Sequence, residues 1–112
     1  MFPKINRLDK AGFSLLKKQG RRINGKLISV IYSPSEGNLP SKAAIIVSKK
    51  VSLKSVVRNE IKRKIRLEVK KYLTNNNLGQ KLLFIARKEI LLKNQYEVGQ
   101  EVYSILKKIN FI

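Results

Sequence analysis

Apolar side chains recur at every third or fourth position between residues 57 and 73, and this repeat constrains the fold more than any other feature of the chain. The residues of the repeat are Val57, Ile61, Ile65, Val69 and Tyr72. This spacing places side chains on one face of an α-helix, the strongest helix predicted in the sequence. The asparagine run 75–77 and Gly79 are expected to end it. Such a helix must bury its apolar face against a second layer, which predicts a layered domain.

Three short apolar runs are predicted to form the sheet of that domain. They cover residues 27–32, 43–48 and 82–86, are rich in β-branched and aromatic residues, and are bounded by turn residues. The first two runs, separated by a loop at 33–42, are expected to form an antiparallel pair. Two further helices are predicted at residues 8–19 and 94–109, the second opened by Asn94 and Glu97 in capping-box spacing. The order α-β-β-α-β-α, with room for a further short strand, defines an α+β fold in a single domain, residues 1–112.

The charge balance limits what this domain can do. The 112 residues include 25 Lys and Arg against 7 Asp and Glu, a formal net charge of +18 that predicts an anionic partner. Cys and His are absent, which excludes disulfides, thiolate nucleophiles and imidazole chemistry. The carboxylates are scattered singly, so we expect no nuclease activity from the protein alone. No apolar run resembles a signal peptide or a membrane span, which predicts a cytoplasmic protein with no membrane association.

The positive charge is concentrated at residues 49–73, which hold ten basic and two acidic residues. A helical wheel places one contiguous sector of polar residues beside the apolar face: Asn59, Lys62, Arg63, Arg66 and Lys70. We call these five residues the basic stripe; a phosphate backbone could follow it, with affinity that falls as salt rises. Glu60 lies outside the stripe and is expected to pair with Lys64. The alternatives are a merely solvated helix face or a helix lying on an anionic membrane.

Two aromatic residues outside this basic segment are candidates for base stacking. On the first helix, Leu8, Ala11 and Leu15, with Leu16 beside them, are expected to form the buried face, which leaves Phe13 next to Lys17 near the surface. Phe13 and Tyr32 are therefore candidates to stack on a single strand, with ordinary packing as the alternative. The tyrosines at 96 and 103 are interpreted as structural.

Two motifs in the middle of the chain resemble a known family. Val47-Ser48-Lys49-Lys50-Val51 and the following segment 56–66, which contains Arg58-Asn59-Glu60, are similar to the signature of the bacterial ribonuclease P protein subunit. Phe13, Gly20-Arg21-Arg22 and residues 84–87 also match, so the likeness spans nearly the whole chain. The sequence departs from the pattern at Glu60, where the family has a second arginine, at Lys17, and at Ile31, which takes the place of a strand aromatic.

The resemblance implies a fold, a function and a set of binding residues. It implies an α/β sandwich with a left-handed β-α-β crossover, as in a ribosomal-protein domain. It also implies a subunit of the ribonuclease P enzyme, in which the catalytic RNA and its Mg²⁺ ions remove the 5′ leader of precursor tRNA while the protein binds both RNAs. The residues expected to bind the RNA subunit are Lys49, Lys50, Arg58, Asn59, Lys62, Arg63, Arg66 and Lys70. Those expected to bind the leader are Phe13, Lys17, Tyr32, Ser48 and Arg87.

Two other functions are alternatives to this reading. A ribosomal protein or general RNA chaperone of similar fold would use the same basic helix without a leader cleft. A protein-only nuclease would need a carboxylate cluster that the sequence does not offer. Acceleration of cleavage by an RNA subunit at limiting Mg²⁺ would separate the first two readings. No dedicated protein partner, catalytic residue or protein-held metal is expected.

Overall fold

The computed structural model describes residues 2–74 and 76–112 and contains a four-stranded sheet. Its strands are β1 (Arg21–Asn24), β2 (Ile28–Tyr32), β3 (Lys42–Ile46) and β4 (Lys81–Ala86). They lie in the order β1-β2-β4-β3, with β4 antiparallel to β2 and parallel to β3. The short β1, which pairs antiparallel with β2, is the further strand for which the sequence left room.

The predicted pairing of the first two apolar runs is wrong, because β4 lies between β2 and β3. Parallel neighbours cannot be joined by a tight turn, so the chain must cross from the end of β3 to the start of β4. Helix α2 (Ser55–Leu73) makes this crossover. The two strands that are neighbours in sequence are therefore separated by one that is distant in sequence.

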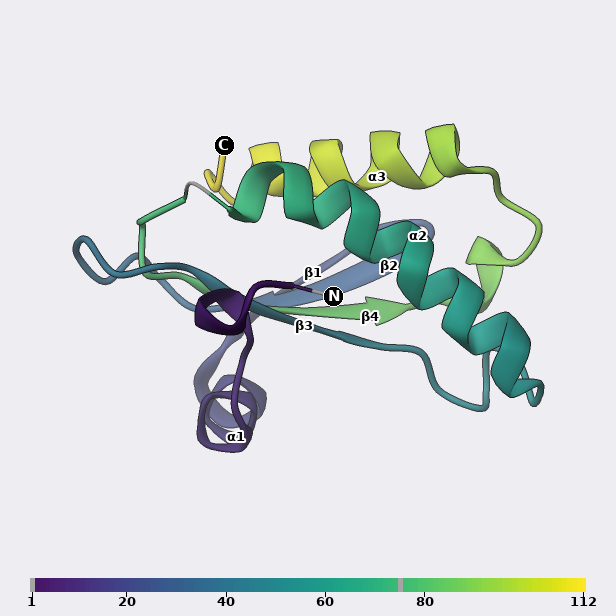
Figure 1. Ribbon diagram of the computed structural model, residues 1–112, viewed down its shortest axis with the longest axis horizontal. Coiled ribbons are helices and arrows are strands. Elements are labelled where there is room, and N and C mark those ends of the chain that lie inside the picture. The colour runs from purple at the N-terminus through teal and green to yellow at the C-terminus, as the bar shows by residue number, and fades with distance from the viewer. Residues whose placement is uncertain (1, 75) are drawn as a thin grey trace.

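The helices cover the two faces of the sheet unequally. Helices α2 and α3 (Gln95–Lys108) lie side by side over one face, and α1 (Lys10–Gln19) lies on the other (Figure 1). Two 3-10 turns, η1 (Lys4–Asn6) and η2 (Lys88–Ile90), precede α1 and α3. The predicted order α-β-β-α-β-α is confirmed. Helix α2 ends at Leu73, before the asparagine run, of which Asn75 lies outside the described residues.

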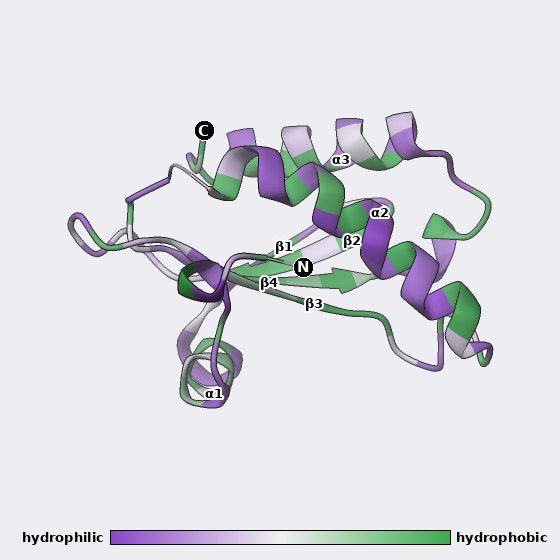
Figure 2. Cartoon of the chain, viewed as in Figure 1, coloured by the Kyte–Doolittle hydropathy of each residue, from purple (hydrophilic) through white to green (hydrophobic). Residues whose placement is uncertain are grey.

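The main core fills the space between the sheet and the α2–α3 layer. Ile61, Ile65 and Val69 of α2 are buried in one cluster with Phe84 of β4, which is fully buried. Figure 2 shows the matching pattern, with hydrophobic strands and an α2 ribbon that alternates between hydrophobic and hydrophilic along its length. The apolar repeat that predicted this helix is thus the face that it buries.

The predicted buried face of α1 is wrong. Leu16 is buried, whereas Ala11 and Leu15 are exposed. A Cβ on Gly20 would lie 2.5 Å from Cγ2 of Ile31, so the end of this helix approaches β2 more closely than any larger residue would allow. The helix therefore packs through the four-residue spacing of Gly12, Leu16 and Gly20, and not through the face with the most apolar residues.

The start of α3 has the predicted capping box. The side chain of Asn94 accepts a hydrogen bond from the backbone N–H of Glu97 at 2.8 Å, and the Glu97 carboxylate accepts one from the backbone N–H of Asn94 at 3.3 Å. These bonds satisfy two donors that a helix start otherwise leaves free. Among the described residues, no helix is both long and apolar enough to cross a membrane.

A buried carboxylate connects α2 with α3, and the sequence did not predict that it would be buried. Glu68 is 7% exposed, accepts a hydrogen bond from Gln95 Nε2 at 2.6 Å and pairs with Lys71 Nζ at 2.9 Å. Gly99 makes room for it, because a Cβ there would lie 2.6 Å from Oε1 of Glu68. Burial raises the pKa of Glu68, but the hydrogen bonds from Lys71 and Gln95 outweigh burial, so its pKa lies below the ordinary value.

Glu68→Gln is expected to reduce the acid sensitivity of the fold. A carboxyl whose pKa is lowered by folding stabilises the protein above its unfolded pKa, and this contribution is lost as the pH falls through the lower, folded value. The variant should therefore be less stable than the wild type at neutral pH, by about 1 to 2 kcal/mol. Urea melts from pH 7 downward would show the gap closing below the ordinary glutamate range; a gap independent of pH would contradict this role.

Candidate RNA interface

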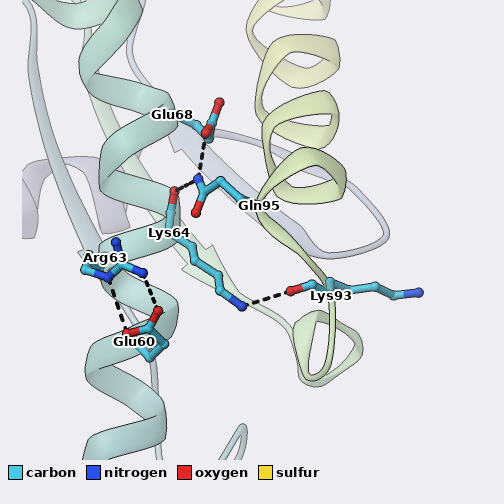
Figure 3. A network of polar contacts seen from close by, with 6 residues as sticks. All are labelled: Glu60, Arg63, Lys64, Glu68, Lys93 and Gln95. Atoms are coloured by element: carbon cyan, nitrogen blue, oxygen red, sulfur yellow. Dashed lines mark hydrogen bonds and ion pairs between the residues drawn. The ribbon is translucent and has the colours of Figure 1, made fainter.

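The basic stripe lies on the flank of α2 that faces away from α3. The opposite flank is occupied: Nζ of Lys64 donates to the carbonyl oxygen of Lys93 at 3.0 Å, and Nε2 of Gln95 donates to the carbonyl oxygen of Lys64 at 2.9 Å (Figure 3). Within the described part of the chain, Lys62, Arg66 and Lys70 form no ion pair. The structure therefore leaves most of the stripe available to an external anion.

Arg58 performs a local task at the start of α2. Its Nη1 donates to the carbonyl oxygens of Ser52 at 3.0 Å and of Leu53 at 2.9 Å. These bonds hold the loop that carries the exposed residues Lys49 and Lys50 against the first turn of the helix. The geometry brings these two lysines to the same end of α2 as Asn59, but turns the Arg58 guanidinium toward the loop.

The partner predicted for Glu60 is wrong. Its carboxylate pairs with Arg63, one turn along the helix, and accepts from both Nε at 3.3 Å and Nη2 at 2.5 Å (Figure 3). Lys64 is unavailable because it bonds to the loop before α3. The hydrogen bond from Arg63 lowers the pKa of Glu60, and the same pairing raises the pKa of Arg63. Within the basic stripe, the charge of Arg63 is therefore already neutralised by Glu60.

Glu60→Gln should strengthen RNA binding by releasing Arg63. The exposed pair itself contributes little stability, so the melting temperature should hardly change. One more free cation should steepen the dependence of log K on log salt by up to about 0.7 to 0.9. Salt titrations of the variant with structured RNA test this, and Glu36→Gln, which changes the charge equally in the distant loop after β2, is the matched control. Weaker binding by the Glu60 variant would mean that the carboxylate itself contributes to the contact.

The α1 side of the sheet carries a second group of polar and basic residues. Ser29 and Ile85 alternate along their strands with core residues and so face away from the α2–α3 layer. They line a depression of about 500 Å³, whose other lining residues include Arg22, Ser48, Lys50, Arg87 and Lys88. We call this the sheet depression. It brings together Ser48 and Arg87, two of the expected leader-binding residues.

Phe13 and Lys17 form a separate pair on α1. The Lys17 ammonium lies 5.4 Å from the centre of the Phe13 ring, within the range of a cation–π contact. Phe13 is half-buried and lines a different hollow, of about 390 Å³, with residues 8–10 and Ser14. The structure thus places these two residues together but does not place them among the residues that line the sheet depression.

Tyr32 is not brought to either group. It is half-buried and packs against the main core, so its side chain lies on the α2–α3 face of the sheet. The neighbouring Ile31 lies on the α1 side, where its Cγ2 approaches Gly20. Successive strand residues point to opposite faces, so a shift of one position moves a side chain across the sheet. Ile31, and not Tyr32, therefore lies on the α1 side of β2.

Sequence reasoning missed Arg22 and Lys88 in the sheet depression. Arg22 lies in β1, the short strand for which the sequence left room, and Lys88 begins the short turn η2. The available signals were their basic character next to predicted strands and, for Arg22, the match of Gly20-Arg21-Arg22 to the family. In residues 2–74 and 76–112, no three of the His, Cys, Asp and Glu side chains gather into a group that could hold a metal ion.

The sheet with helices on both faces and the accessible basic flank of α2 define a small α+β protein of the RNA-binding class. A family model described as Ribonuclease P matches residues 2–110. The chain belongs to the ribonuclease P protein family, the protein subunits of the ribonucleoprotein enzyme that processes tRNA. The sequence resemblance is therefore confirmed, and the ribosomal-protein and chaperone alternatives are set aside.

Relatives of known name agree with this assignment. The ribonuclease P protein component of Microcystis aeruginosa is 34% identical over 114 residues, covering 98% of this chain and 95% of its own length. The Clostridium kluyveri protein component is 36% identical over 101 residues, covering 88% of each. Among solved structures, a mutant of the Staphylococcus aureus RNase P protein superposes with a TM-score of 0.82 at 26% identity, covering 96% of this chain and 90% of its own.

Proposed function

We propose that the chain binds the RNA subunit of ribonuclease P along the basic stripe of α2 and the 5′ leader of precursor tRNA across the α1 side of the sheet. One observation supports the contact with the RNA subunit. Among the described residues, Lys62, Arg66 and Lys70 on the flank of α2 that faces away from α3 form no ion pair. Lys49 and Lys50 extend this surface at the start of the helix. The protein would act in the cytoplasm, where precursor tRNA is made.

The sheet depression supports a path for the leader. It is lined by two of the expected leader-binding residues, Ser48 and Arg87, whose side chains can donate hydrogen bonds to phosphate oxygens. The Phe13 ring on α1 offers a surface on which a base can stack. Arg87 also has its own carboxylate partner, Glu89, at 3.8 Å, and a phosphate would have to compete with it. Ile31 in place of an aromatic leaves Phe13 as the stacking residue of this path.

We assign Mg²⁺ to the RNA subunit and the substrate. Magnesium prefers carboxylate and other oxygen donors, and the described carboxylates do not converge on one site. The donor set of this chain therefore does not fit a resident metal. On this proposal the protein screens phosphate charge and positions the leader, and none of its side chains carries out the chemistry.

Reconstitution tests the whole proposal. The protein alone, freed of RNA, should leave precursor tRNA intact in the presence of Mg²⁺. Added to the cognate RNA subunit at limiting Mg²⁺, it should accelerate cleavage at the mature 5′ end. Specific cleavage by RNA-free protein would contradict the division of labour, and an RNA subunit that gains no activity from the protein would contradict the assigned role.

Phe13→Ala is expected to weaken binding in a leader-dependent way. Loss of one base–aromatic stack costs about 1 to 3 kcal/mol, so the holoenzyme should bind precursor tRNA with a leader of several nucleotides less tightly. Its affinity for mature tRNA, which lacks the stacked segment, should stay the same. Paired affinities with both ligands decide the matter. Equal losses for both ligands would remove Phe13 from the leader path.

A further inference from the structure

A groove between α2 and α3 gathers three of the four tyrosines of the chain on the surface away from α1. It has a volume of about 380 Å³, and the lining residues that matter here are Lys71, Tyr72, Tyr96, Gly99, Gln100 and Tyr103. We call it the tyrosine groove. Tyr96 is 71% exposed and Tyr103 is 47% exposed, so neither ring serves mainly to fill the core. The interpretation of these two tyrosines as structural therefore does not account for their positions.

The groove wall on α3 is a continuous row. Tyr96 and Tyr103 are seven residues apart, which places them on the same line of the helix two turns from each other. Gln100 lies between them, and its Nε2 donates to the Tyr96 hydroxyl at 2.7 Å, which orients that ring. Gly99 leaves room for the Glu68 carboxylate at the floor of the groove, because a Cβ there would lie 2.6 Å from Oε1 of Glu68. The result is two aromatic rings on one line of α3, the first of which is oriented by Gln100.

The charge around the groove favours a polyanion. The Lys107 ammonium lies 5.9 Å from the centre of the Tyr103 ring and supplies the positive charge beside the groove, whereas Lys71 on the opposite wall is paired with Glu68. The acidic group of the groove, Glu68, is nearly buried and already paired with Lys71 and Gln95. Tyr72 supports the Tyr103 ring from α2, with ring centres 6.3 Å apart. With a net charge of +18 on the chain, an acidic or nucleic-acid ligand would be drawn to this surface.

We propose that the tyrosine groove binds single-stranded RNA, with bases stacked on Tyr96 and Tyr103 and a phosphate near Lys107. Single-stranded RNA meets both requirements of the site, since an aromatic ring can stack on any base and a lysine ammonium donates hydrogen bonds to phosphate oxygens. The groove is lined by residues of α2 and α3. These helices cover one face of the sheet, whereas the proposed leader path lies on the other face, on the side of α1 (Figure 1). It is therefore a second RNA contact and does not depend on the leader proposal.

Tyrosine emission offers a direct test, because the chain contains no tryptophan. A short unstructured RNA oligonucleotide should quench this emission in the full-length wild-type protein. Its affinity should fall about thirtyfold or more in the Tyr96→Ala, Tyr103→Ala double variant, because two stacks are lost at about 1 to 3 kcal/mol each. The matched variants Tyr96→Phe and Tyr103→Phe retain the rings and should bind nearly as the wild type does. A duplex of the same sequence, whose bases are already stacked, should not distinguish the Ala variants from the wild type.

Cross-linking locates the contact without relying on variants. The same oligonucleotide carrying 4-thiouridine, irradiated in complex with the wild-type protein, should attach to the segment 95–108 as well as to the basic stripe. Cross-links confined to α1, the sheet and the basic stripe would overturn the proposal, as would unchanged affinity in the folded Ala double variant. A loss of activity in Phe13→Ala bears only on the leader path, so the two proposals fail separately.

Discussion

Replacing Lys62, Arg66 and Lys70 together with alanine is expected to weaken binding to the RNA subunit by about two orders of magnitude near 0.1 M salt. Each cation that neutralises a phosphate releases about 0.7 to 0.9 of a counterion, so three lost contacts lower the slope of log K against log salt by roughly two to three units. These side chains lie on the free flank of α2, and none of them belongs to the core cluster. Stability should change little.

The control for this experiment is a variant with the same loss of charge elsewhere. Lys18, Lys26 and Lys108 are exposed on α1, on the turn before β2 and at the end of α3. Replacing these three with alanine lowers the net charge equally. If the basic stripe is a true interface, only the α2 variant loses the full slope. Equal effects in the two variants would show that net charge, and not the position of the stripe, determines affinity.

The periodic features of the sequence predicted the parts of the fold that depend on local spacing. The buried face of α2, the capping box of Asn94 and Glu97, and the positions of the main strands were all recoverable from patterns within one element. The basic stripe belongs to this class as well, because it is the sector beside an apolar face that must be buried. An interface on the flank of a helix can be predicted from the sequence when the buried face of that helix can be predicted.

The wrong predictions concern strands and side chains whose partners are determined by residues of another helix, strand or loop. The first two apolar runs were expected to pair, but the crossover through α2 places β4 between them. Glu60 could reach Arg63 or Lys64 with equal ease along the helix, and the choice depends on the Lys93 carbonyl, which captures Lys64. The spacing of residues within one element contains no information about β4 or about the Lys93 carbonyl.

The α1 helix shows why counting apolar residues selects the wrong face. Ala11 and Leu15 raise the apolarity of one side, but Gly20 allows the other side to approach Ile31 of the sheet closely. Close approach buries Leu16 and leaves Leu15 44% exposed. On β2 an error of one position in matching the sequence to the family is enough to choose the wrong side chain. Successive strand residues point to opposite faces, so Ile31 and Tyr32 lie on different sides of the sheet.

Phe84→Ala should destabilise the protein more than any change proposed above. Phe84 is fully buried in β4, the strand that pairs with both β2 and β3, and it belongs to the cluster that joins the sheet to α2 and α3. Truncating a buried phenylalanine costs about 3 to 5 kcal/mol. For a domain of this size the melting temperature should fall by more than about 10 °C, as thermal melts followed by circular dichroism would show.

Phe13→Ala is the matched control, because it removes the same side chain from a half-buried position on α1. If Phe13 lies at the RNA surface, its variant should melt within a few degrees of the wild type and lose affinity only for leader-bearing tRNA. The Phe84 variant should instead lose affinity for both tRNAs in proportion to the folded protein lost. A Phe13 variant that melts as low as the Phe84 variant would place its ring in the core, and the α1 side of the sheet would then lack a stacking residue altogether.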